Sequence, residues 1–162
     1  MPEGVEYTPP ANSQEAALKS NWFSRWFPVA LIAAVIYWLS SEPDPYGLLP
    51  KNVYQWIYLT HIFNIRLTKI VGPLAHLTLF ALFAFLLTRA IGQGNHNTRK
   101  IGALVLALTF LYALSDEFHQ LFVPGRAFEI TDLALDFLGG AAGLIIWHLL
   151  TNIRRKVPEL VE

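Results

Sequence analysis

The stretch SDEFHQLFVPGRAFEITDLALDFLGG, residues 115–140, carries most of the polar chemistry of this chain and separates two long apolar segments. Residues 101–114 before it are almost entirely apolar, and residues 137–150 contain one histidine among apolar residues and glycines. The polar side chains between them are Asp116, Glu117, His119, Gln120, Arg126, Glu129, Asp132 and Asp136. Inside a membrane each charge at mid-depth would cost roughly 2.5 to 3.5 kcal/mol, so such residues need partners and predict a functional site.

The composition is that of a membrane protein. Hydrophobic residues make up 54% of the chain and charged residues 15%, against about 25% charged in ordinary soluble domains. The formal net charge is zero and no basic stripe is present, which argues against a nucleic-acid partner. The absence of cysteine excludes disulfides, thiolate metal sites and a cysteine nucleophile.

Apolar length predicts four membrane spans and therefore an all-α, integral membrane four-helix bundle. The predicted spans are residues 22–40, 70–91, 101–123 and 129–151, each long enough to cross a hydrocarbon core of about 30 Å at about 1.5 Å per residue. Together they form a membrane domain, residues 22–151. A polar tail, residues 1–21, with at most a short helix at 13–19, precedes it, and a basic tail, residues 152–162, follows.

The connection between the first two spans predicts an interfacial segment. Residues 51–66, KNVYQWIYLTHIFNIR, lack the apolar length to span, but they suit a helix lying in the membrane interface. Its apolar side would comprise Val53, Trp56, Ile57, Leu59, Ile62 and Phe63. This side would either contact lipid, as a lid or shelf, or pack on the end of the bundle. The weak polar face favours packing.

Lysine and arginine predict the orientation. With four spans, both termini share a side with Lys19, Arg25, Arg89, Arg99, Lys100, Arg154, Arg155 and Lys156, whereas Lys51, Arg66, Lys69 and Arg126 lie opposite. The positive-inside rule therefore places both termini in the cytoplasm of a bacterial cell and residues 115–140 on the outer side of its cytoplasmic membrane, or of a membrane derived from it.

Three spans bring their polar residues to one depth in the outer leaflet. His76 lies about 9 Å inside the second span and Asp136 about 10 Å inside the fourth, at 1.5 Å per residue. The predicted site comprises His76, Asp116, Glu117, Gln120, Arg126, Asp132 and Asp136. By the i, i+3, i+4 rule Asp116, His119 and Gln120 share a helix face, whereas Glu117 points about 100° away from Asp116.

Two local patterns shape this site. Pro124-Gly125 predicts a tight turn that makes the last two spans a hairpin and holds Arg126 over its mouth, where it could bind a carboxylate bidentately. We expect Arg126 to close, at least in part, a network with the acids. Gly139 and Gly143 have GxxxG spacing and predict close helix contact within the bundle.

These residues resemble the signature of the VanZ-like family, roughly DE-x-x-Q-x-F-x-P-x-R followed by D-x-x-x-N-x-x-G-x-x-x-G. The matching residues are Asp116, Glu117, Gln120, Phe122, Pro124, Arg126, Asp132, Gly139 and Gly143, and His76 and Ser41-x-Pro43 match looser features. Asp136 stands where the family usually has Asn, and the family's Asp-Lys pair shortly before its His is absent. The resemblance covers about residues 22–150. It implies a membrane protein related to one linked to low-level resistance to the lipoglycopeptide teicoplanin.

Three functions remain open from the sequence. The favoured one is a non-enzymatic envelope protein that binds a lipid headgroup or a lipophilic glycopeptide, with the site residues as ligand contacts rather than a purely structural ion-pair network. The second is a structural subunit of a larger membrane complex, in which His61 or His148 could ligate a pigment or haem. The third is an intramembrane acid–base hydrolase or transferase that uses His76. No HExxH or similar spacing exists, so we expect no metal and no cofactor.

Overall fold

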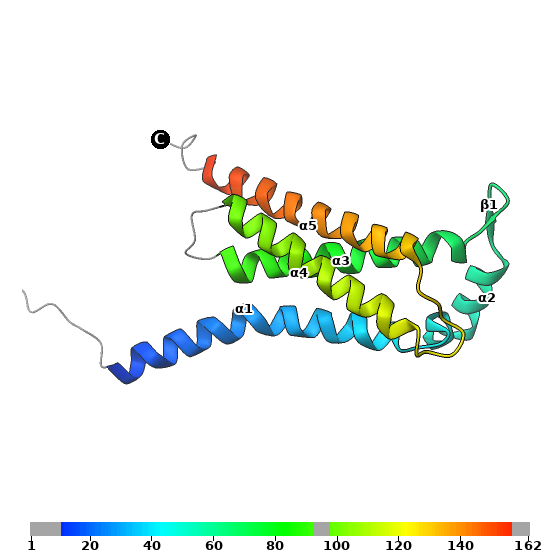
Figure 1. The fold of residues 1–162 in the computed structure, drawn as a ribbon, viewed down its shortest axis with the longest axis horizontal. Coiled ribbons are helices and arrows are strands. Elements are labelled where there is room, and N and C mark those ends of the chain that lie inside the picture. The colour runs from blue at the N-terminus through cyan, green and yellow to red at the C-terminus, as the bar shows by residue number, and fades with distance from the viewer. Residues whose placement is uncertain (1–10, 93–97, 157–162) are drawn as a thin grey trace, which may run out of the picture.

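The computed structural model describes residues 11–92 and 98–156, with side chains described for 22–92 and 98–153. In chain order the elements are α1 (Ala11–Ser40), the short 3-10 helix η1 (Pro45–Leu48), α2 (Lys51–Leu59), β1 (His61–Ile62), β2 (Ile65–Arg66), α3 (Thr68–Gly92), α4 (Thr98–Gln120) and α5 (Ile130–Lys156). The four long helices lie side by side, and η1, α2 and the two strands gather at one end of the bundle (Figure 1).

The prediction of an all-α membrane bundle is confirmed. Each long helix contains a stretch apolar and long enough to cross a membrane, namely Trp22–Ser40, Thr68–Gly92, Thr98–Gln120 and Ile130–Ile153. Many of their large apolar side chains are exposed, including Leu31, Leu82, Leu111 and Ile145. A soluble protein would bury such a surface, so these side chains face lipid.

The helix ends differ from the predicted spans. Helix α1 runs unbroken from Ala11, so a separate short helix at 13–19 is wrong. Residues 11–20, ANSQEAALKS, are rich in good helix formers and extend the helix beyond the span that begins at Trp22. Helix α4 ends at Gln120, three residues before the predicted 123, because the chain turns there. The outer parts of the two predicted tails, residues 1–10 and 157–162, lie outside the described residues.

The predicted interfacial helix over residues 51–66 is only half correct. Helix α2 ends at Leu59, and β1 and β2 then form a two-residue antiparallel hairpin. Its turn residues Phe63 and Asn64 have φ of 49° and 65°, as a type I′ turn requires. Of the six residues predicted to pack, only Ile57 is buried, whereas Phe63 is 96% exposed. The exposed apolar side chains favour the lipid-contacting alternative over packing.

Helix α3 lies at the centre of the packing, against α5 on one side and α1 on the other. The α3–α5 contact is close because Gly139 and Gly143 of α5 lie directly on the backbone of α3 at Leu77 and Ala81. The close helix contact predicted from their spacing is therefore present within the bundle. Between α1, α3 and α4 a buried apolar cluster fills the interior, and the Tyr112 hydroxyl donates a 2.7 Å hydrogen bond to the Ala33 carbonyl.

The predicted orientation can be tested with single cysteines, because the chain has none of its own. Gly47 is exposed at the end of the bundle that holds η1, and Gly92 ends α3 at the opposite end with open space around it. We expect a membrane-impermeant maleimide to label Gly47→Cys in intact cells and Gly92→Cys only after lysis. The reverse pattern would place the 115–140 region in the cytoplasm.

Candidate functional site

The turn between α4 and α5 fixes the position of Arg126. The Arg126 amide donates a 3.1 Å hydrogen bond to the Val123 carbonyl, and Gly125 has φ of 81°. Pro124 and Gly125 thus occupy the two central positions of a type II turn, where proline presets φ and glycine tolerates a positive value. The tight turn predicted from Pro124-Gly125 is confirmed.

Arg126 reaches from this turn to the end of helix α1. Its Nε donates to the Glu42 carbonyl and its Nη2 to the Leu39 carbonyl, each at 3.3 Å. No carboxylate in the described part of the chain lies within ion-pair distance of Arg126, so the predicted bidentate pair and closed network with the acids are wrong. Carbonyls at and just beyond the end of a helix carry partial negative charge, which explains why the guanidinium binds there; the Leu39 carbonyl also accepts a 3.3 Å hydrogen bond from the Glu42 amide.

His76 is held by two carboxylates from one face of α5. Its Nδ1 lies 3.0 Å from Asp136 Oδ1, within hydrogen-bond distance, and its Nε2 lies 3.6 Å from Asp132 Oδ2. The two aspartates are four residues apart and so share a helix face. The structure thus brings together three of the predicted site residues, from the second and fourth spans.

Asp116 and Glu117 are both buried but accept hydrogen bonds from different neighbours. The Gln120 side-chain amide donates a 3.1 Å hydrogen bond to Asp116 Oδ2 one turn away. Glu117 Oε2 accepts a 2.8 Å hydrogen bond from the Glu129 amide, at the residue before α5 begins. A carboxylate there satisfies one of the free amides at a helix N-terminus. The two acids therefore diverge as their adjacent positions predict.

His119 does not join this group. Its Nε2 lies 3.0 Å from Ser41 Oγ, and its ring lies 4.7 Å from the Tyr37 ring. Asp116, His119 and Gln120 share a face of α4 as expected, but the His119 imidazole contacts the end of α1 instead of the other site residues. Ser41 Oγ donates to the Tyr37 carbonyl at 2.7 Å, so this serine accepts from His119 rather than being activated by it.

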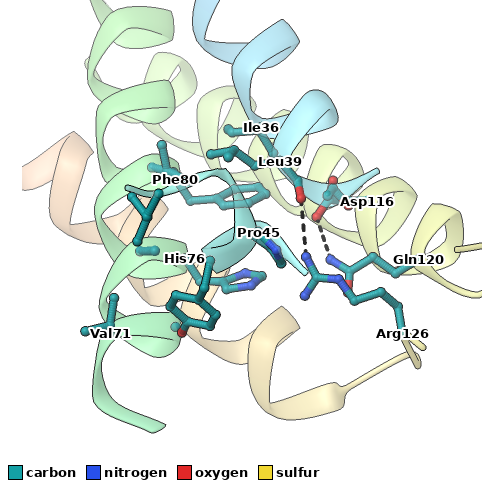
Figure 2. A pocket seen from close by; sticks show the side chains of 15 residues that line it. Ile36, Leu39, Pro45, Val71, His76, Phe80, Asp116, Gln120 and Arg126 are labelled. Atoms are coloured by element: carbon teal, nitrogen blue, oxygen red, sulfur yellow. Dashed lines mark hydrogen bonds between the residues drawn. The ribbon is translucent and has the colours of Figure 1, made fainter. Parts of the chain in front are cut away.

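Two cavities meet at this end of the bundle. An inner cavity of about 220 Å³ has mostly apolar walls, and its polar lining residues include His76, Asp116, Gln120 and Arg126. In Figure 2 the His76 ring and the Arg126 guanidinium both point into it. An outer cavity of about 390 Å³ has a more polar lining that includes Asp44, Glu129 and Asp132. The residues common to both linings are Pro45, Tyr46, Gln120 and Arg126.

Tyr46 is a site residue that the sequence did not reveal. Its hydroxyl donates a 3.0 Å hydrogen bond to the Thr68 carbonyl, and a Cβ at Gly72 would lie 3.2 Å from it. Burial raises the pKa of Tyr46, so this hydroxyl stays protonated and remains a donor. Tyr46 lies in a proline-rich connection without periodicity, where no pattern distinguishes a wall residue from a linker residue.

The two histidines considered for pigment binding lie elsewhere. His61 is exposed in β1, where its Nδ1 lies 3.0 Å from the Leu59 carbonyl oxygen, and His148 is half-buried in the distal half of α5. By contrast, His76, Glu117 and Asp136 each place one potential metal-ligand atom within 4.8 Å of the others. Among the described residues, the side chains best placed to bind a metal ion therefore lie where α3, α4 and α5 meet.

Comparison with protein-family models gives one match. The model described as VanZ/LLP1 matches residues 21–151, which include the first three spans, all but the last two residues of the fourth, and both cavities. The resemblance stated from residues 115–140 is thereby confirmed. Neither the curated proteins nor the solved structures contain a match to the chain.

Proposed function

This chain belongs to the VanZ/LLP1 family, and we propose that it binds the polar headgroup of a membrane lipid, or of a lipophilic glycopeptide, in the outer leaflet. Such binding would serve maintenance of the cell envelope or resistance to the glycopeptide. The membrane-spanning bundle supports this proposal, because a ligand anchored in the bilayer would lie beside a site near one end of the spans.

The position of Arg126 carries the proposal. Its guanidinium lies on the wall common to both cavities, and the hydrogen bonds described for it go to neutral carbonyls. A cation held in place without a paired carboxylate retains its charge for an anionic ligand. Arginine also suits phosphate and carboxylate groups because its fork of N–H donors can bind two oxygens at once.

The acids around Arg126 suggest what else the ligand carries. Asp44, Glu129 and Asp132 line the outer cavity together with Arg126. These carboxylates would repel a simple anion but would attract an ammonium group next to it. We therefore expect a ligand with both charges, such as a phosphoethanolamine headgroup, with its phosphate on Arg126 and its amine toward the acids.

The apolar surroundings suit the rest of such a molecule. Ile36, Leu39 and Phe80 line the inner cavity. Trp56, Leu59 and Phe63 of the neighbouring α2 and hairpin are exposed at the same end of the bundle. A headgroup at Arg126 could thus leave its acyl chains in contact with apolar side chains and with the bilayer.

The test compares headgroups on purified protein in detergent. Phosphatidylethanolamine, phosphatidylglycerol, phosphatidylcholine and teicoplanin are titrated separately. We expect phosphatidylethanolamine or teicoplanin to bind the natural chain, and Arg126→Ala to weaken that binding at least about 10-fold because a charge-assisted, two-oxygen contact is lost. The two ligands distinguish a lipid role from an antibiotic role.

The matched control is Arg66→Ala, which removes an exposed arginine of β2 that lines neither cavity. Its binding should equal that of the natural chain. Thermal unfolding is measured in parallel, because Arg126 also satisfies the end of α1. If Arg126→Ala lowers stability but leaves binding per folded molecule unchanged, its role is structural and the proposal fails.

A second candidate function is acid–base catalysis by His76, favoured by its hydrogen bond to Asp136 beside the inner cavity. A carboxylate that orients an imidazole is a common arrangement in general-base catalysis. Within residues 22–92 and 98–153, no serine or threonine hydroxyl is hydrogen-bonded to His76, so water would be the nucleophile. The test is to incubate the lipid that binds with the protein and to measure the mass of the lipid by mass spectrometry. An unchanged mass excludes this function.

A further inference from the structure

We infer that His76, Glu117 and Asp136 together bind one divalent transition-metal cation. The three residues come from α3, α4 and α5, and each offers a ligand atom within 4.8 Å of the other two. This spacing lets three ligand atoms surround one ion. The inference rests on these contacts alone and does not depend on headgroup binding.

Two buried carboxylate oxygens accept no hydrogen bond from any neighbour in the described structure. They are Glu117 Oε1 and Asp136 Oδ2, and both side chains are fully buried. Each carboxylate uses its other oxygen, on the Glu129 amide and on His76 respectively. Because buried polar atoms are nearly always partnered, two free oxygens in one cluster call for a missing partner that accepts lone pairs. A cation meets that requirement.

The charges of the cluster also balance with a divalent ion. Arg126 hydrogen-bonds to carbonyls and not to these acids, so it does not neutralise them directly. Burying two carboxylates between membrane-spanning helices is costly when no lysine or arginine in the described structure pairs with either. One divalent cation with two carboxylates and a neutral imidazole has zero net charge, which removes most of that cost.

The surroundings of His76 fit a metal ligand. His76 Nδ1 and Asp136 Oδ1 lie 3.0 Å apart, close to the roughly 3.3 Å between two ligands of one zinc ion with bonds of about 2.0 to 2.1 Å. A cation could therefore take the place of the shared proton and also meet the free Oδ2, because a carboxylate can bind one metal ion through both of its oxygens. The other nitrogen, Nε2, faces Asp132 Oδ2 at 3.6 Å. Metal-bound histidines commonly present their second nitrogen to a carboxylate in this way.

The donor set indicates the class of metal. One imidazole and two carboxylates, without a thiolate, suit Zn²⁺, Mn²⁺ or Fe²⁺ better than Ca²⁺ or Mg²⁺, which prefer oxygen ligands alone. Sequence spacing gave no sign of this site, because its ligands are contributed singly by three helices. The inferred site therefore replaces the expectation, drawn from the sequence, that the chain binds no metal.

The test measures metal binding by the full chain in detergent, without added lipid. The purified protein is stripped with a chelator and titrated with Zn²⁺ by calorimetry, and with Co²⁺ while its visible absorption is recorded. We expect one equivalent to bind, a higher thermal midpoint with Zn²⁺, and a Co²⁺ spectrum typical of nitrogen and oxygen ligands. Glu117→Gln and Asp136→Asn should each weaken binding about 100-fold, and Asp132→Asn by about 10-fold.

The control is His148→Gln, which removes a half-buried histidine from the C-terminal half of α5, away from the cluster. It should leave the affinity for Zn²⁺ unchanged. Failure of the natural chain to bind Zn²⁺ or Co²⁺ would overturn the inference, as would binding that neither ligand variant weakens. If the variants do not fold, the Co²⁺ spectrum of the natural chain still decides. A negative result here leaves headgroup binding untouched, since that is measured with lipid and at Arg126.

Discussion

Gly143→Ala is expected to lower the free energy of unfolding of the bundle by about 3 kcal/mol or more. A Cβ at this position would overlap the carbonyl group of Ala81, which belongs to the backbone of α3. A backbone carbonyl cannot rotate away as a side chain can, so α5 would have to move away from α3 and lose its contact. Thermal unfolding in detergent and the amount of protein in the membrane measure the loss.

The matched control is Gly102→Ala, in the interior of α4. A Cβ there would lie 3.4 Å from the flexible Leu144 Cδ2, an ordinary contact. Alanine also favours a helix over glycine by up to about 1 kcal/mol, so this variant should be neutral or slightly stabilised. Equal losses in the two variants would mean that α3 and α5 do not meet through Gly143.

The sequence predicted the features that depend on length and local chemistry. Apolar length determined the four spans, Pro124-Gly125 the turn, and the spacing of Gly139 and Gly143 the close contact. Each of these signals lies within one segment and needs no knowledge of the neighbouring helix. The rise per residue also predicts that His76 and Asp136 lie at one level of the bundle, and their side chains do meet.

The sequence could not predict contacts between side chains and the ends of helices that lie far away along the chain. The sequence predicts a pairing of Arg126 with the acids because it displays side-chain charge but does not show which backbone carbonyls, here those of Leu39 and Glu42, lie within reach. For the same reason nothing in the sequence marks Ser41 as the neighbour of His119. The hairpin after α2 places Phe63 at positive φ, which its residue type does not signal.

His76→Leu is expected to destabilise the protein by about 3 to 5 kcal/mol when metal is removed with a chelator. The change leaves Asp136 fully buried without its 3.0 Å partner, and an unpaired buried carboxylate is expensive. The double variant His76→Leu with Asp136→Leu should recover most of that loss, because it replaces both polar groups by apolar ones. Unfolding of the natural chain, both single variants and the double variant completes the cycle.

The double variant separates stability from function at this site. If His76 and Asp136 served only to hold α3 and α5 together, an apolar pair would be an adequate replacement, and buried polar pairs are often dispensable for folding. We expect the double variant to fold but to bind no Zn²⁺, and to retain Arg126 in its place on the end of α1. A loss in the double variant equal to the sum of the two single losses would show that His76 and Asp136 are not coupled, and would contradict the contact between them.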